Sequence, residues 1–201
     1  MTTLGSRLLD AAFGTPRGLL GRLGGAVMAR GNADQERQAV RRTTLRAGDR
    51  VLVLGHGPGV GLAEAAAAVG PGGHVLGLDP SPLMRDLAAR RCAREIAAGT
   101  VEVRSGTAED TGCPDASVDA VVSVNNVMLW DRPAGFAEVA RVLRPGGRLV
   151  VSVHRHVLDA TPEHLGAEAA AAGFTGVELE VRPRKRNSPA IELVARRDES
   201  R

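Results

Sequence analysis

The sequence predicts an α/β fold with a seven-stranded sheet: five parallel strands, then a C-terminal antiparallel hairpin, with helices on both faces. Short apolar runs such as Val51–Leu54 alternate with helical patterns, which is typical of parallel strands buried on both faces. Only residues 182–189 separate the last two apolar runs, Val177–Val181 and Ile191–Ala195. Because this spacer is too short for a crossover helix, we expect these runs to pair as a hairpin.

Caps and turn residues set the boundaries of the expected elements. Ser81-Pro82 and Thr161-Pro162 each combine an N-cap with a proline at the first helical position. Gly31-Asn32 is expected to end one helix, and Asp34 to cap the next. The expected elements are, in order, helix 34–45, strand 51–54, helix 60–69, strand 74–78, helix 82–98, strand 101–104, strand 118–124, helix 132–143, strand 148–153, helix 162–172, and hairpin strands 177–181 and 191–195.

The size and composition fit a single domain. The chain has 201 residues, 43% hydrophobic and 24% charged, which is enough for a packed core. We expect a helical extension in residues 1–47 and the main domain in residues 48–201. Aromatic residues make up 2%, which argues against a site that stacks several bases or encloses a cation in an aromatic cage. No apolar run has the length of a membrane span and we find no secretory signal, so we expect a cytoplasmic protein with no membrane partner.

Cysteines and charges exclude further classes. Two cysteines, Cys92 and Cys113, do not make a disulfide framework or a metal cluster, so no metal is expected. The net charge is +3, but a single lysine stands among the 26 basic residues. We attribute this arginine bias to a GC-rich genome rather than to a nucleic-acid partner. The basic run 182–186 is interpreted as a solvated loop, and a homodimer remains open.

A glycine loop and an acid mark a candidate nucleotide site. The sequence Gly55-His-Gly-Pro-Gly59 directly follows the first strand, and Asp79 ends the second strand, 24 residues after Gly55. Glycines allow a tight turn and a close ligand approach, the helix N-terminus offers free N–H groups, and a carboxylate can accept both ribose hydroxyls. Val60 stands where the dinucleotide pattern G-x-G-x-x-G has its last glycine. Val60 and the terminal hairpin therefore argue against a nicotinamide-dependent oxidoreductase.

This loop resembles motif I of the class I S-adenosylmethionine (SAM) dependent methyltransferases, which have a Rossmann-like fold. The match is of the small-molecule type found in ubiquinone and menaquinone biosynthesis. Further segments resemble this family's second motif, its adenine loop, the lead into its fourth strand and the junction before its fifth strand. These segments are Gly77–Met84, Gly106–Asp110, Pro114–Val122 and Arg141–Val150, and the resemblance covers about residues 46–154.

The resemblance implies a SAM-dependent methyltransferase that methylates a small-molecule acceptor and releases S-adenosylhomocysteine. His56 stands where the family usually has a small or sulfur-containing residue, and Thr107 where it often has an acid. The cofactor-binding residues that the resemblance implies, together with their neighbours in the same loops, are Gly55, His56, Gly57, Gly59, Asp79, Pro80, Met84, Thr107, Ala108, Glu109 and Asn125.

The acceptor is expected beyond the carboxyl ends of the fourth and fifth strands, where ligands bind in open α/β sheets. His154 and His156 are the candidate general bases, because the unperturbed histidine pKa lies near 6.5. Candidate substrate-binding residues are Asn126 and Trp130 after the fourth strand, and Arg17, Arg30 and Asn32 in an N-terminal lid. Asn125-Asn-Val-Met128 replaces the Asx-Pro-Pro-aromatic motif of DNA amino-methyltransferases, which argues against methylation of DNA bases.

Two other functions stay open on the same fold. An RNA- or protein-methylating enzyme would use the arginine-rich tail and Arg90-Arg91. A protein that binds SAM without transferring its methyl group would need no general base.

Overall fold

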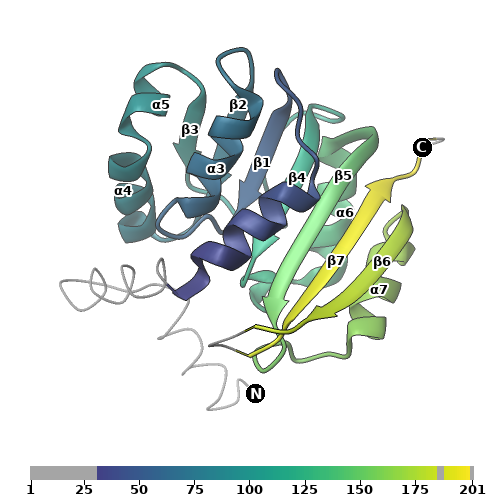
Figure 1. Ribbon diagram of the computed structural model, residues 1–201. Helices are drawn as coiled ribbons and strands as arrows, with labels where there is room; N and C mark the ends of the chain where they lie inside the picture. The colour runs from purple at the N-terminus through teal and green to yellow at the C-terminus, as the bar shows by residue number, and fades with distance from the viewer. Residues whose placement is uncertain (1–30, 185–187, 200–201) are drawn as a thin grey trace.

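The computed structural model describes residues 31–184 and 188–199 (Figure 1). The strands are β1 (Arg50–Leu54), β2 (His74–Leu78), β3 (Val101–Arg104), β4 (Val118–Val124), β5 (Leu143–His154), β6 (Phe174–Arg182) and β7 (Ala190–Arg197). The helices are α3 (Val60–Val69), α4 (Pro82–Arg91), α5 (Ala93–Ala97), α6 (Arg132–Val142) and α7 (Pro162–Ala171), with a 3-10 turn, η2, at Val127–Leu129. Residues 31–42 are also helical. None of the helices within these ranges is long and apolar enough to cross a bilayer.

The sheet confirms the predicted topology. Its strand order is β3-β2-β1-β4-β5-β7-β6, with β1 to β5 parallel and β7 antiparallel to both β5 and β6. The order reverses between β1 and β4. In open α/β sheets this reversal opens a crevice at the carboxyl ends of the neighbouring strands. The candidate site is therefore expected beside the ends of β1 and β4.

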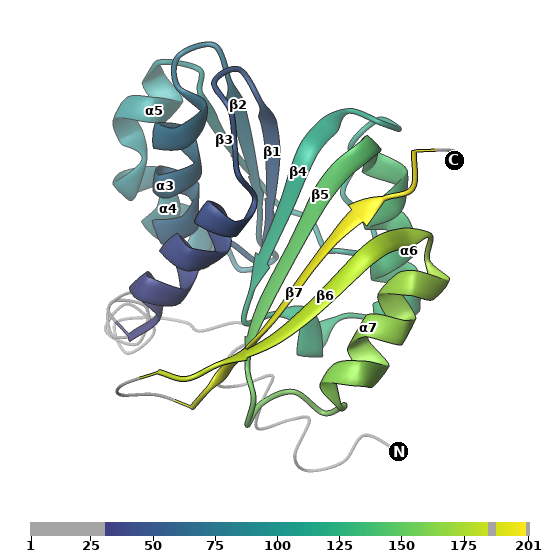
Figure 2. The ribbon, with the colours of Figure 1, turned by 45° about the vertical axis from the view of Figure 1, so that its right-hand side comes forward.

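Helices cover both faces of the sheet (Figure 2). Strand residues alternate between the faces, so in β1 Val51 and Val53 pack with α3 and residues 31–42, while Leu52 and Leu54 pack with α6. Phe136 of α6 and Leu165 of α7 are fully buried in the cluster on this second face. The two-residue period of the strands thus divides the core into two apolar layers.

Most predicted boundaries and the caps predicted at Ser81 and Thr161 are confirmed. Ser81 Oγ accepts from the Met84 N–H at 3.4 Å, and Thr161 Oγ1 accepts from the His164 N–H at 3.2 Å. The expected helix 82–98 was wrong as a single helix, because it is split at Cys92, which ends α4 and begins α5. Cys92 is fully buried, and its thiol lies 3.8 Å from the carbonyl oxygen of Gly59. Packing against the glycine loop thus accompanies the break in the helix.

The fifth strand is longer than expected. β5 already begins at Leu143, which pairs with Val118, before the Pro145-Gly-Gly147 segment that was expected to precede the strand. The pairing then shifts register, and Ala120 lies opposite Arg148. The proline and glycines are therefore accommodated as an irregularity within the strand.

The helix before β1 also differs from the prediction. Residues 31–42 are continuously helical, so Gly31-Asn32 does not end a helix and Asp34 does not cap one. The Asp34 carboxylate instead pairs with Arg184, which follows β6. Ala39 and Val40 are buried in the same cluster as Val53 and Val124. The described part of the 1–47 extension therefore belongs to the core of the sheet.

Candidate functional site

The glycine loop after β1 has a backbone that needs glycine. Gly55, Gly57 and Gly59 all have positive φ, at 57°, 52° and 84°. A Cβ on Gly55 would lie 2.4 Å from Asn126 Nδ2, and a Cβ on Gly59 would lie 2.9 Å from the Ala88 Cα. A Cβ on Gly57 would meet no atom within 4 Å. The loop is thus packed tightly underneath at Gly55 and Gly59 and open at Gly57, which is the shape of a cradle for a ligand.

Asp79 connects the end of β2 to this loop. Its Oδ2 accepts from the Gly57 N–H at 2.9 Å, and its Oδ1 accepts from the Ser81 N–H at 2.9 Å. The residue is 6% exposed, and burial raises the pKa of its carboxyl, opposed mainly by the nearby His56. Each oxygen can accept further hydrogen bonds. Hydrogen bonds therefore join the predicted acid to the predicted loop.

His56 lies beneath the loop. Its Nδ1 is 2.7 Å from the Gly57 carbonyl oxygen, so Nδ1 carries the ring proton and donates there. A Cβ on Gly77 would lie 2.9 Å from His56 Cδ2, so the ring packs over the β2 backbone. Burial lowers the pKa of the ring, and its buried Nε2 has no hydrogen-bond partner among the described residues. This neutral ring supports the loop and offers one unused acceptor.

Four further residues predicted to bind the cofactor lie at the start of α4 and in the loop after β3. Met84 is buried in the first turn of α4, and Pro80 is exposed just before that helix. Ala108 is buried, whereas Thr107 is exposed and its Oγ1 accepts from the Asp110 N–H at 3.3 Å. The loop after β3 thus presents an exposed hydroxyl and a small buried side chain.

A hydrogen bond connects the loop after β3 to the segment after β4. Glu109 Oε1 accepts from the Asp131 N–H at 2.8 Å, so the carboxylate is occupied by backbone. Trp130 packs edge-on against Phe136 at 5.8 Å. A Cβ on Gly135 would lie 2.9 Å from the Trp130 ring and 3.4 Å from Ala108 Cβ, so the indole adjoins the β3 loop.

Asn126 joins the ends of β1 and β4. Its Nδ2 donates to the Leu54 carbonyl at 2.7 Å, and its Oδ1 accepts from Ser123 Oγ and Trp130 Nε1, both at 2.8 Å. Both ends of the amide are therefore used inside the protein. Asn126, predicted to bind substrate, lies beneath Gly55 as a support for the loop.

Asn125 begins a polar network on the other side of the loop. It has a positive φ of 55°, and its Oδ1 accepts from the His154 N–H at 2.9 Å. Its side-chain amide also exchanges hydrogen bonds with Gln35, at 3.1 and 3.2 Å. Gln35 Nε2 in turn donates to Ser152 Oγ on β5 at 2.9 Å. The network brings together β4, β5 and the helix of residues 31–42.

Arg184 closes this network. Its side chain is 3% exposed and donates to Asp34, to Gln35 Oε1 at 3.0 Å and to the His154 ring, 3.2 Å from Nδ1. His154 Nε2 lies 3.0 Å from Asn32 Oδ1, so we place the ring proton on Nε2. Burial, and then Arg184 and His156, lower the pKa of His154. His154 is therefore neutral near pH 7, with both ring nitrogens occupied.

His156 is exposed, and its ring centre is 5.4 Å from that of His154. Asn32 is placed beside this histidine pair, while Arg17 and Arg30 lie outside the described residues. The sequence prediction missed Gln35, Ser152 and Arg184. A polar residue within the apolar run of β5 was a signal for Ser152, but nothing local marks the other two.

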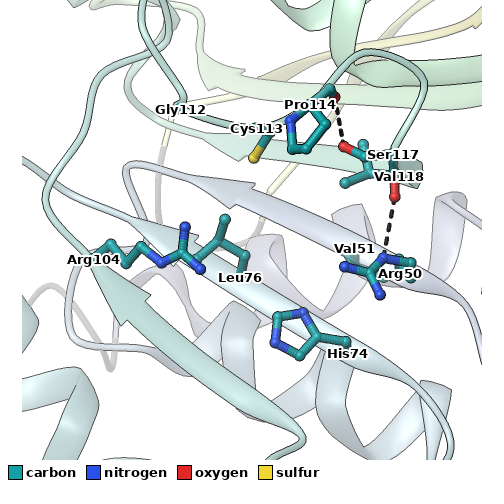
Figure 3. A pocket seen from close by; sticks show the side chains of 10 residues that line it. All are labelled: Arg50, Val51, His74, Leu76, Arg104, Gly112, Cys113, Pro114, Ser117 and Val118. Carbon is teal, nitrogen blue, oxygen red and sulfur yellow. Dashed lines mark hydrogen bonds between the residues drawn. The ribbon is translucent and has the colours of Figure 1, made fainter.

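A separate cavity of about 80 Å³ lies away from this site (Figure 3). Arg50, His74 and Val118, the first residues of β1, β2 and β4, line it, so it lies toward the amino ends of the strands. The glycine loop follows the opposite ends of the same strands. The cavity is therefore not part of the candidate cofactor site.

Comparisons with known proteins agree with the geometry. Residues 51–147 match the family described as a methyltransferase domain. An uncharacterized methyltransferase of Bacillus subtilis is 29% identical over 166 residues, covering 79% of this chain and 89% of the relative. The nocamycin O-methyltransferase of Saccharothrix syringae is 43% identical over 52% of this chain, and the chain spans 37% of that enzyme. The demethylmenaquinone methyltransferase of Symbiobacterium thermophilum is 34% identical over 62% of this chain, which spans 50% of that enzyme.

Solved structures share the fold at low identity. A SAM-dependent methyltransferase from Aquifex aeolicus superposes with a TM-score of 0.67 at 18% identity, covering 80% of this chain and 88% of the other. A (4+2)-cyclase superposes with a TM-score of 0.70 at 18% identity, covering 97% of this chain and 93% of the other. The glycine loop, the acid, the strand order and these matches agree, and together they support a class I SAM-dependent methyltransferase domain in residues 51–147.

Proposed function

We propose that this chain uses the glycine loop and Asp79 to hold SAM, and methylates a small-molecule acceptor with release of S-adenosylhomocysteine. The main observation in favour is the hydrogen bond from the Gly57 N–H to Asp79. Gly57 follows β1, and the strand order reverses between β1 and β4. Bound SAM would supply a methyl group on a sulfonium centre, so that the acceptor forms a bond to the methyl carbon as the sulfur–methyl bond breaks and S-adenosylhomocysteine leaves. Asp79 would accept from the ribose hydroxyls, and the open backbone at Gly57 would admit the methionine portion.

The acceptor would lie over the segment that follows β4. Met128 and Trp130 are partly buried against the core there, and Leu129 is 43% exposed. Such a surface favours an acceptor with an apolar body. Relatives whose names denote demethylmenaquinone and nocamycin methylation support a small molecule of this kind. Of the extension predicted in residues 1–47 as a lid, residues 1–30 lie outside the described residues, and Ala39 and Val40 pack into the core.

Proton removal, where an acceptor needs it, would fall to His156. Arg184 and Asn32 engage both nitrogens of His154, and the arginine disfavours a protonated ring. His154 then acts as a positioning residue for its neighbour. His156 is exposed, and its ring lies beside that of His154.

SAM binding without transfer is the second candidate function, since the same fold also occurs in a (4+2)-cyclase, whose name denotes a reaction other than methyl transfer. The observation that favours it is the engagement of His154 by Arg184. Methylation of RNA has less support. Arg184 of the basic run is buried against Asp34, and Arg91 donates to the Pro58 carbonyl at 2.7 Å, so both serve the fold.

The test is incubation of the purified chain with SAM and a panel of phenols, enols, quinols and amines, with S-adenosylhomocysteine measured by mass spectrometry. Acceptor-dependent product is the expected result. For an acceptor that must lose a proton, we expect His156→Asn to lower kcat roughly 100-fold with little change in the Kd for SAM. Tight SAM binding with no product from any acceptor would favour the second candidate.

A further inference from the structure

Glu36 reaches the glycine loop from outside the sheet. It lies on the helix of residues 31–42, and its carboxylate accepts a hydrogen bond from the backbone N–H of Gly61 in the first turn of α3. A Cβ on Gly61 would lie 2.5 Å from Glu36 Oε2 and 3.8 Å from Val53 Cγ1. Position 61 therefore has to be glycine for the carboxylate to approach the helix so closely.

The carboxylate compensates for a helix end that has no cap of its own. The N-cap of α3 is Gly59, which has no side chain, and the first turn of α3 contains no acid. The positive end of the helix dipole and the free N–H groups attract an anion. Glu36 places a carboxyl group at this helix end from a helix that precedes β1 in the chain. The nearest side chain from the sheet, Val53, offers no hydrogen-bond acceptor.

The surroundings of Glu36 favour the protonated form of its carboxyl group. Burial raises the pKa of this carboxyl to about 8, against the opposing effects of the Gly61 N–H and Arg91. Arg91 belongs to α4 and is itself bonded to the Pro58 carbonyl of the loop. On the helix of residues 31–42, the neighbouring Arg37 is paired with Glu64 of α3 at 2.9 Å. The carboxyl thus has one cation at a distance and no direct salt bridge among the described residues.

A half-buried acid with no direct salt bridge, beside a loop built to approach a ligand, is suited to a cationic group of that ligand. The cofactor's amino-acid portion carries an α-ammonium group. Asp79 is the other acid hydrogen-bonded to the glycine segment within the described residues, and it bonds to Gly57 on the ribose side. Glu36 bonds two residues beyond the last loop glycine, at the start of α3.

We propose that Glu36 is the residue that binds the α-ammonium group of SAM and S-adenosylhomocysteine. The inference rests on the proposed function. Its rival is that the Glu36 carboxylate stands in for the ligand's own carboxylate at the helix end, which would make it a competitor. The two hypotheses predict opposite effects of a mutation at Glu36, because removing a binding residue weakens ligand binding and removing a competitor strengthens it.

The test is titration calorimetry at pH 8 with S-adenosylhomocysteine and with 5′-methylthioadenosine, which lacks the amino-acid portion. Glu36→Gln retains the shape of the side chain and an oxygen for the Gly61 N–H. We expect it to weaken the binding of S-adenosylhomocysteine roughly 10- to 100-fold and to leave the binding of 5′-methylthioadenosine unchanged. Glu64→Gln, one turn into α3, is the matched control and should bind both ligands as the wild type does.

A second readout follows the proton. Near pH 7 the Glu36 carboxyl is mostly protonated, and contact with an ammonium group makes it ionise and release the proton to solvent. Binding enthalpies in phosphate and in Tris should therefore show release of roughly one proton by the wild type and none by Glu36→Gln.

Four results would overturn the inference. Tighter S-adenosylhomocysteine binding by Glu36→Gln would favour the competitor, and unchanged binding would show that Glu36 does not contact the ligand. Equal weakening of both ligands would reduce Glu36 to a support of the loop. Wild-type binding of 5′-methylthioadenosine without preference for S-adenosylhomocysteine would remove the need for an ammonium-binding residue while leaving an adenosyl site in place. If the wild type binds neither ligand, the proposed function fails first, and the inference fails with it.

Discussion

The two halves of the sheet form their sites in different ways. Around β1 and β2, the glycine loop and Asp79 meet through a hydrogen bond between residues 22 positions apart. Around β4, β5 and β7, the contacts join Gln35 to Ser152 across 117 positions and Arg184 to Asp34 across 150. The cofactor half is therefore built from a short local motif, whereas the acceptor half depends on the helix before β1 and the C-terminal hairpin.

This difference explains what the sequence could predict. Glycines, an acid and their spacing follow from the chemistry of nucleotide binding, so the loop and Asp79 could be found without a structure. The strands and the two proline-marked helix starts were also predictable, because period and capping are local properties. The order of elements likewise predicted the hairpin.

The acceptor half could not be predicted in the same way. Gln35 lies in an ordinary polar helix pattern, and its partners are known only once the chain is folded. Asp34 had the sequence signature of a helix cap, yet a distant guanidinium holds it within a helix. Ser152 on β5 and Glu192 on β7 interrupt apolar runs, and these interruptions are the local signal that a buried polar network exists.

The largest expected effect is in the cofactor half. Gly59→Ala adds a Cβ against the α4 backbone at a φ of 84°, and we expect it to lower the free energy of unfolding by about 3 kcal/mol. It should also weaken SAM binding. The matched control is Gly57→Ala, which has a positive φ but open space, and it should cost about 1 kcal/mol in stability. Urea unfolding of both variants measures the difference, and equal losses would show that close packing does not shape the loop.

The acceptor half should respond next. Gln35→Ala removes a fully buried amide and strips partners from Ser152, Asn125 and Arg184, so we expect a loss of roughly 2.5 kcal/mol in urea unfolding. Gln38→Ala, one turn along the same helix and partly exposed, should change stability by less than about 0.5 kcal/mol. If both variants behave alike, the network contributes nothing to the fold, and the contrast between the halves disappears.

A smaller effect is expected where the loop between β3 and β4 joins the halves. Glu138 accepts from Thr111 and Arg141, and these bonds, the one from Arg141 above all, lower the pKa of its carboxyl to about 2. Because Arg141 is partly exposed, solvent screens this ion pair. We therefore expect Glu138→Gln to lower the free energy of unfolding by about 2 kcal/mol.

The pH dependence of that loss has a defined sign. Since the folded pKa lies below the unfolded value of 4.5, the stabilisation is complete above about pH 5 and disappears as the pH falls through 2. Unfolding measured from pH 7 to pH 2 should therefore show the wild type and the variant converging. Glu102→Gln is the control. Glu102 forms an exposed pair with Arg104, and its replacement should lower the free energy of unfolding by less than about 0.5 kcal/mol. A constant difference at all pH values would mean that the carboxylate charge is not the cause.

The most direct test of the account is titration calorimetry of the wild type, Asp79→Asn and the exposed control Asp86→Asn with SAM, S-adenosylhomocysteine and NAD. We expect micromolar binding of both adenosyl ligands and none of NAD. Asp79→Asn should lose at least about 30-fold in affinity for both, while Asp86→Asn binds them as the wild type does. Binding of NAD without the adenosyl ligands, or full affinity in Asp79→Asn, would contradict the assignment of the glycine loop and Asp79 as the SAM site.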